Sequence, residues 1–150
     1  MVNRAQINRG TFYAHYSDIS DVIRQMMKEA FQSILDVFAD QNCTIEALPG
    51  LLLGKIETVL DENQQFYRRI LASNASKQLS DRLYEVVVEN LLEHEGDFET
   101  ISHGDFEMKV RFCAGGLSRL YQDWFSGNLQ CSREKFNQKA ELLLSRVIGL

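Results

Sequence analysis

Apolar positions recur at intervals of three and four along most of this 150-residue chain. That period fits the 3.6 residues per turn of an α-helix, whereas half-buried strands would show strict alternation. The clearest stripe begins at Asp18, which is a suitable N-cap, and Asp21 adds negative charge where a helix dipole favours it. No segment alternates long enough to indicate a strand, so the pattern predicts an all-α fold. The helices expected before the closing pair cover residues 18–39, 44–60, 63–72 and 76–95.

The two most regular stripes lie near the end of the chain, after a stretch at 94–104 whose Gly, Asp, Ser and His residues predict a loop. Their apolar positions alternate between steps of three and four, the a/d spacing of helices in four-helix bundles. Two such helices cannot complete a four-helix bundle alone, so either earlier helices or a second copy of the chain completes it. We predict a homodimer held by residues 105–148, with an interface at Val110, Leu117, Leu120, Phe136, Ala140, Leu143 and Val147.

Composition agrees with long helices in an ordinary globular domain. The chain has one proline, Pro49, and nine glycines, so few positions interrupt a helix. Pro49 must lie in the first turn of its helix or kink it, because only the opening turn tolerates a missing N–H. No apolar run approaches the roughly 20 residues of a membrane span, and the first residues lack the apolar centre of a signal peptide. We therefore expect a cytoplasmic protein with reduced thiols at Cys43, Cys113 and Cys131.

The charge is unevenly distributed. A formal net charge of −5 argues against a protein that coats nucleic acid non-specifically. Residues 1–16 contain Arg4 and Arg9 and no acidic side chain, whereas the other residues carry 14 basic and 21 acidic side chains, a net charge of −7. A small basic end on an acidic body is compatible with a tip that contacts DNA.

The segment Ile7 to Tyr16, INRGTFYAHY, carries the most specific chemistry. On a helix beginning near Asn8, Phe12 and Tyr16 share one face and would pack inward with Ile7. The opposite side is polar, aromatic and basic, as a helix in a major groove requires: arginine can pair with guanine, a methyl group can meet thymine, and tyrosine or histidine can bind phosphate. Glycine would let the backbone approach closely. The residues expected to face DNA are Arg9, Gly10, Thr11, Tyr13, Ala14 and His15.

The longer run INRGTFYAHYSDISDVI resembles the recognition helix and connector helix of the TetR family of transcriptional regulators. The residues that match the family's pattern are Ala5, Ile7, Thr11, Phe12, Tyr13, His15, Tyr16 and Asp18. This resemblance implies a TetR-like helical bundle in which residues 1–17 are part of a helix-turn-helix. Residues 18–150 would then be the connector helix and a C-terminal domain for ligand binding and dimerisation. The implied function is a ligand-responsive, dimeric DNA-binding regulator that acts as a repressor.

The chain departs from the family's pattern in two places. The family's DNA-binding domain has three helices, and residues 1–4 leave no room for the first two, so we expect a fragment, a start placed too far downstream, or a protein that has lost direct DNA binding. Ile19 stands near a position where many members carry a phosphate-binding lysine, which predicts weaker DNA affinity there. The alternative function is therefore a helical dimerisation and ligand-binding module that acts through protein partners.

Ordinary packing or solvation accounts for most of the other polar and aromatic residues. His94 and His103 are better interpreted as parts of a solvated loop than as metal ligands, because the sequence has no metal-ligand spacing around them. No nucleophile stands beside a base at motif spacing and no glycine-rich phosphate loop occurs, so we expect neither an enzyme nor a cofactor. Gly115 and Gly116 favour close helix packing over room for a ligand. The aromatic side chains that could line an effector pocket are Tyr67, Tyr84, Phe112, Tyr121 and Trp124, and Arg68, Arg69 and Arg119 could pair with an acidic effector.

Overall fold

The computed structural model describes residues 19–39, 43–97 and 103–150, and all regular structure in them is helical. The α-helical fold class is therefore confirmed, and no strand occurs in these three ranges. The elements are α2 (Ile19–Leu35), α3 (Leu48–Glu62), α4 (Gln64–Leu71), α5 (Ser76–Glu93), the 3-10 turn η1 (Glu95–Asp97), α6 (His103–Phe125) and α7 (Arg133–Ile148).

The helix ends follow from local chemistry. Pro49 lies in the first turn of α3, where its missing N–H breaks no helical bond. Asn63, with φ of −139°, separates α3 from α4. Ser132 caps α7 by accepting a hydrogen bond from the Lys135 backbone N–H at 3.2 Å. Before α7, Gly127 adopts φ of +83°, a left-handed conformation that glycine enters without a Cβ clash.

The expected boundaries differ from the observed ones at two ends. The first stripe continues to residue 39, but α2 ends at Leu35 and residues 36–39 form turns. The loop expected at 94–104 is shorter, because η1 occupies Glu95–Asp97 and α6 already begins at His103. Apolar spacing continues through a turn that still packs on the core, so it overestimates helix length.

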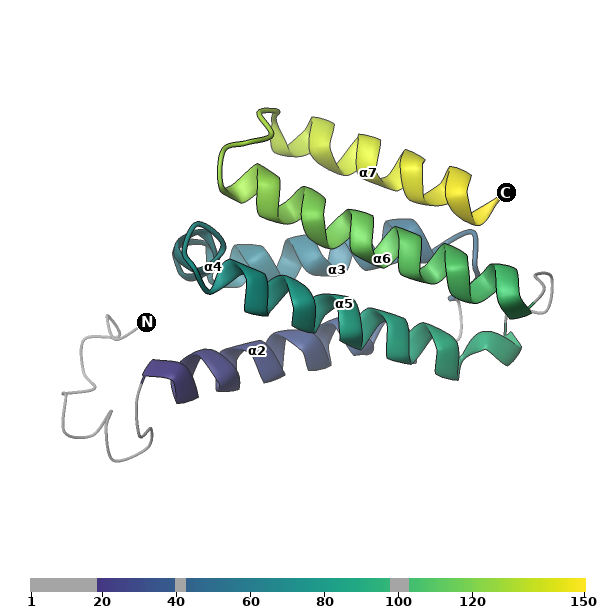
Figure 1. Ribbon diagram of the computed structural model, residues 1–150, viewed down its shortest axis with the longest axis horizontal. Coiled ribbons are helices and arrows are strands. Elements are labelled where there is room, and N and C mark those ends of the chain that lie inside the picture. The colour runs from purple at the N-terminus through teal and green to yellow at the C-terminus, as the bar shows by residue number, and fades with distance from the viewer. Residues whose placement is uncertain (1–18, 40–42, 98–102) are drawn as a thin grey trace.

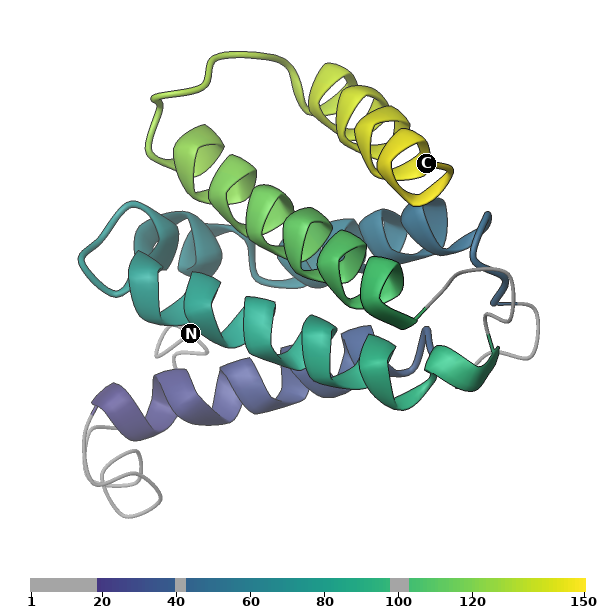
Figure 2. The same cartoon turned by 45° about the vertical axis from the view of Figure 1, so that its right-hand side comes forward.

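The helices form one bundle in which α5 and α6 are the most extensively packed pair. Figure 1 shows the order α2, α5, α6, α7 across the bundle, with α3 behind these helices. Figure 2 shows the same order from another direction. The short α4 closes one end against α3, α5 and α6. Within the described ranges, no helix combines the length and hydrophobicity needed to cross a bilayer.

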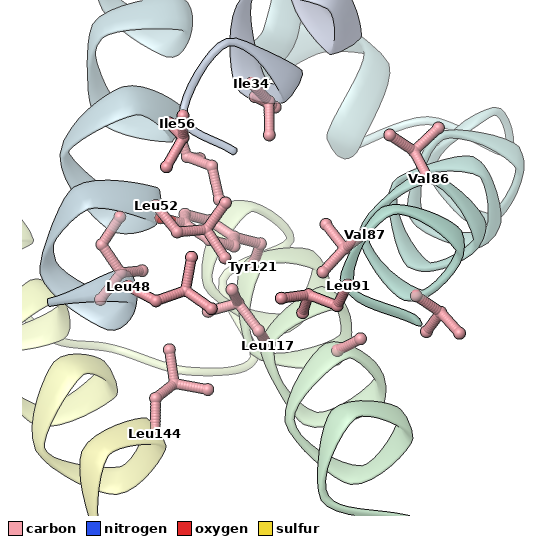
Figure 3. Packing of buried hydrophobic residues seen from close by; sticks show 14 of the residues in the cluster. Ile34, Leu48, Leu52, Ile56, Val86, Val87, Leu91, Leu117, Tyr121 and Leu144 are labelled. Atoms are coloured by element: carbon pink, nitrogen blue, oxygen red, sulfur yellow. The ribbon is translucent and has the colours of Figure 1, made fainter. Parts of the chain in front are cut away.

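One continuous hydrophobic core joins α2 through α7. Phe106 at the start of α6 is 1% exposed, and burial of one such side chain contributes about 1.5–3 kcal/mol. At the other end of α6, Trp124 stacks on Phe136 of α7 at a ring distance of 4.7 Å and donates a hydrogen bond from Nε1 to the Cys131 carbonyl at 3.0 Å. Figure 3 shows the centre of this core at Ile34, Leu48, Leu52, Ile56, Val86, Val87, Leu91, Leu117, Tyr121 and Leu144.

Candidate functional site

A small, partly open cavity of about 50 Å³ lies among the helices of the bundle. Side chains from α2, α3, α4, α5 and α6 line it, so five helices meet around one space. None of the described residues that line it carries a charge. Its principal walls are Phe31, Ile34, Ile56, Tyr67, Leu79 and Tyr121.

The rings of Tyr67 and Tyr121 line this cavity, whose surface is apolar. Tyr67 is 4% exposed, and burial, followed by the nearby charges of Glu62 and Glu29, raises its pKa to about 12. Tyr121 is 5% exposed, and burial together with the charge of Glu57 raises its pKa well above the usual value. Both side chains therefore remain neutral phenols at physiological pH, so each keeps a proton to donate.

The Tyr121 hydroxyl is buried and has no hydrogen-bond partner among the described residues. A nearby hydroxyl is already engaged, because Ser118 Oγ donates to the Ala114 carbonyl at 2.8 Å. Buried polar groups in folded proteins are nearly always paired, so this unpaired phenol is an exception within the core.

The other three aromatic residues predicted to line a pocket lie elsewhere. Tyr84 packs beside Gly115, and its hydroxyl accepts a hydrogen bond from Arg111 Nη1 at 3.4 Å. Phe112 is 70% exposed, so its predicted place in a pocket is wrong. Trp124 lines a separate, open groove of about 280 Å³ with Leu60, Asp61, Gln64, Arg68, Phe125 and Arg133.

An ion-pair cluster borders this groove. Arg133 at the start of α7 contacts Glu57 Oε1 at 2.8 Å and Asp61 Oδ1 at 2.6 Å, both on α3. The hydrogen bond from Arg133 is the main reason that the pKa of Asp61 lies below its usual value. Of the arginines considered for an acidic effector, Arg119 pairs with Asp123 at 3.1 Å, whereas Arg68 lines the groove and makes no ion pair with a described residue.

A second feature is an exposed apolar face formed by α6 and α7. Met108 and Phe112, one turn apart on α6, are 74% and 70% exposed. Lys109 Nζ donates to the Ile148 carbonyl at 3.3 Å, so this part of α6 lies against the end of α7. Gly116, one further turn along, has open space where a Cβ would stand.

Leu143 extends this surface onto α7. It is 56% exposed. The side chain of Glu141 lies beside Gly50 of α3. Because two residues turn a helix by about 200°, Leu143 points away from α3. We call Met108, Phe112, Gly116 and Leu143 the α6–α7 face.

Four of the residues predicted to join two copies lie in the protomer's own core, which corrects that assignment. Val110, Leu117, Phe136 and Ala140 are between 3% and 6% exposed, so they have almost no surface for a second chain to cover. Leu120 and Val147 are partly buried, and only Leu143 of the predicted set is exposed. The a/d spacing shows that a stripe faces a helix but not whether that helix belongs to the same chain. Met108 and Phe112, each two residues from Val110, fall on the opposite side of α6, and that offset is the sequence signal for the exposed face.

The DNA-facing residues predicted at Arg9 to His15, and all of 1–17, lie outside the described residues. His94 Nδ1 is 2.8 Å from the Asn90 carbonyl, and its ring stacks on Phe38. In the described part of the chain, no three side chains of the metal-binding types gather into a group.

Comparison with known families decides the classification. Residues 52–146, well over half of the chain, match the TetR-family profile described as "Transcriptional regulator C-terminal region". The chain belongs to the TetR family of transcriptional regulators. The matched region does not contain residues 5–18, which carry the recognition-helix resemblance. The match therefore supports the family independently of that resemblance. TetR-family proteins are regulators and not enzymes. No curated protein and no solved structure matches the chain.

Proposed function

We propose that this TetR-family protein is a homodimeric, ligand-responsive DNA-binding repressor. The observation that carries the proposal is the α6–α7 face, which exposes two large apolar side chains one turn apart, Met108 and Phe112. Large apolar groups gathered on one surface mark interaction sites. The occupant is a second copy of the chain. The α6–α7 face lies within residues 52–146, the region that matches the family profile. A two-fold axis would let the same face of each copy serve both partners.

Gly116 supports this occupant. It lies one turn from Phe112 on the exposed side of α6, and nothing stands within 4 Å of the position of an added Cβ. In antiparallel or parallel helix pairs, a large side chain on one helix packs into the space left by small residues on the other. Phe112 of one copy would fill the space above Gly116 of the other.

The cavity supplies the response to a ligand. Ala30, Phe31 and Ile34 of α2 line it, and α2 directly follows the proposed DNA-reading segment in the chain. A molecule that enlarges the cavity moves α2 and thereby changes the separation of the two reading segments. Binding to successive major grooves requires a spacing of about 34 Å, so the ligand must favour a dimer that cannot reach both grooves.

In this proposal, residues 1–17 belong to the DNA-reading unit and 18–150 form the connector and C-terminal domain. Arg9, with Gly10, Thr11, Tyr13, Ala14 and His15, would face the bases and phosphates. Replacing Arg9 by Ala should weaken specific binding by about 1–3 kcal/mol, the value of one good base contact.

The test is selection of duplexes from a random-sequence library. We expect the wild-type protein to enrich an inverted repeat whose half-sites are centred one helical turn, or a multiple of it, apart. Phe112→Glu should abolish enrichment of the paired site, whereas Leu51→Glu, a matched change at an exposed leucine on α3, should preserve it. Enrichment of no sequence, or of a single half-site regardless of Phe112, would refute the proposal.

A further inference from the structure

The exposed side of α6 carries opposite charges on the two sides of Phe112. Asp105, Phe112 and Arg119 are seven residues apart, which is close to two helical turns, so they lie on one side of the helix. All three are exposed, and the buried Val110 and Leu117 face the other way. At the rise of an α-helix, each charge stands about 10 Å along α6 from Phe112, the acidic one before it and the basic one after it.

Arg119 keeps donors for a second chain. Its Nε donates to Asp123 Oδ2 at 3.1 Å, and its side chain is 68% exposed. A guanidinium has five N–H donors, and this hydrogen bond uses one of them. Arg119 can therefore retain its contact within α6 and also bind a carboxylate from another copy.

A two-fold axis can pair α6 with its copy in two orientations. An axis perpendicular to α6 at Phe112 makes the two helices antiparallel, and Asp105 of each copy then lies level with Arg119 of the other. An axis parallel to α6 would instead place each of these residues opposite the same residue of the partner. Like charges placed against each other oppose association, whereas the antiparallel pair gains two attractive contacts by symmetry.

The direction of the Phe112 side chain favours the same orientation. Side chains on an α-helix lean toward its N-terminus. In an antiparallel pair, this tilt carries Phe112 of one copy toward Gly116 of the other, where an added Cβ would have nothing within 4 Å. In a parallel pair, it would carry Phe112 toward Met108, a large and exposed side chain. The order of charge and the order of side-chain size along α6 thus select one orientation.

We infer that the α6–α7 face is complementary to itself in a single orientation, with α6 antiparallel to α6 of a second copy and with Asp105 and Arg119 forming two equivalent ion pairs across the axis. This inference rests on the proposed function, since it names the residues that select the partner at the proposed dimer face. It makes the charge order along α6 the feature by which the chain recognises a second copy.

The test reverses the two charges singly and then together. Asp105→Arg sets arginine against arginine at both contacts, and Arg119→Asp sets aspartate against aspartate. Each single change should raise the dissociation constant of the homodimer about tenfold, measured by sedimentation equilibrium at low salt. The double variant Asp105→Arg/Arg119→Asp restores both attractions, so its dissociation constant should return to within about threefold of the wild-type value.

Arg82→Asp is the matched control. Arg82 is an exposed arginine with an acid one turn away, Glu85 at 3.2 Å, but it lies on α5 and not on the α6–α7 face. This change should leave the dissociation constant unaltered. Raising the salt concentration to 1 M should reduce the effect of both single reversals, because screening then acts within about 3 Å.

The outcomes separate the orientation from the dimer itself. Single reversals that dimerise as tightly as the wild type, or a double variant as weak as the single ones, would overturn the inference. If Phe112→Glu still separates the copies in that case, the proposed dimer stands and only its orientation is refuted. A wild-type chain that is monomeric would refute both.

Discussion

Leu143 and Leu144 are neighbours on α7 with different surroundings. Leu144 is 9% exposed and belongs to the protomer core, whereas Leu143 is 56% exposed on the α6–α7 face. The same substitution, leucine to alanine, therefore tests two interactions on one helix. Helix propensity is a shared term, because the two positions are both in the interior of α7.

The expected magnitudes differ several-fold. Leu144→Ala should lower the free energy of unfolding by about 2–5 kcal/mol, the range for a buried leucine that leaves a cavity. Leu143→Ala should change it by about 0.5 kcal/mol or less, as for surface substitutions. Leu143→Ala should instead weaken association of the copies, and two-fold symmetry counts the lost contact twice, so a loss of ~1 kcal/mol per copy raises the dissociation constant about 30-fold.

Urea unfolding measures the free energy of unfolding of the single chain. It is best done in the Phe112→Glu background, because the stability of a dimer depends on protein concentration. Sedimentation equilibrium of the two alanine variants with Phe112 intact measures the association of the copies. If both leucines destabilised the single chain equally, or if Leu144→Ala acted only on association, α7 would pack on a partner and the assignment of the core would be refuted.

Three further predictions concern other parts of the bundle. Arg133 lowers the pKa of Asp61, so the Asp61 carboxylate stabilises the fold at pH values above its ordinary pKa of 3.8. That contribution is lost as pH falls through the lower pKa of the folded state. Asp61→Asn should remove this part of the pH dependence of the unfolding free energy, measured by unfolding curves at acid pH. Gly115→Ala places a Cβ 3.7 Å from the Tyr84 ring, an ordinary contact, so the melting transition should reflect up to ~1 kcal/mol of gained stability, and a loss would show that the helices are too close. Spectrophotometric titration should show Tyr67 ionising near pH 12. The contribution of the neutral Tyr67 to the free energy of unfolding should be fully present below pH 10 and be lost as pH rises through 12. Ionisation near pH 10 in the folded state would contradict the burial of Tyr67.

The helices were predictable because their signal is local. The stripe at 44–60 becomes α3 with Pro49 in its first turn, and the stripe at 63–72 becomes α4. Periodicity identifies the buried side of a helix without identifying its neighbour. Val110 and Phe136 therefore joined the predicted dimer surface although both lie in the protomer core.

The cavity and the ion pairs depend on contacts between residues far apart in the sequence. Tyr67 and Tyr121 come from α4 and α6, and only the bundle brings them to one cavity. Arg133 lies 72 residues from Asp61, and no spacing rule connects them. The exposure of Phe112 could have been predicted from the sequence, because its position two residues after the buried Val110 places it on the opposite side of α6.

The claim on which the rest depends is that two copies join through the α6–α7 face. Sedimentation equilibrium in dilute solution tests it directly, without DNA or ligand. We predict a mass of twice the 17.3 kDa chain for the wild type and Leu51→Glu, and the mass of one chain for Phe112→Glu. A wild-type protein that sediments as a single chain, or a Phe112→Glu variant that remains dimeric, would contradict it.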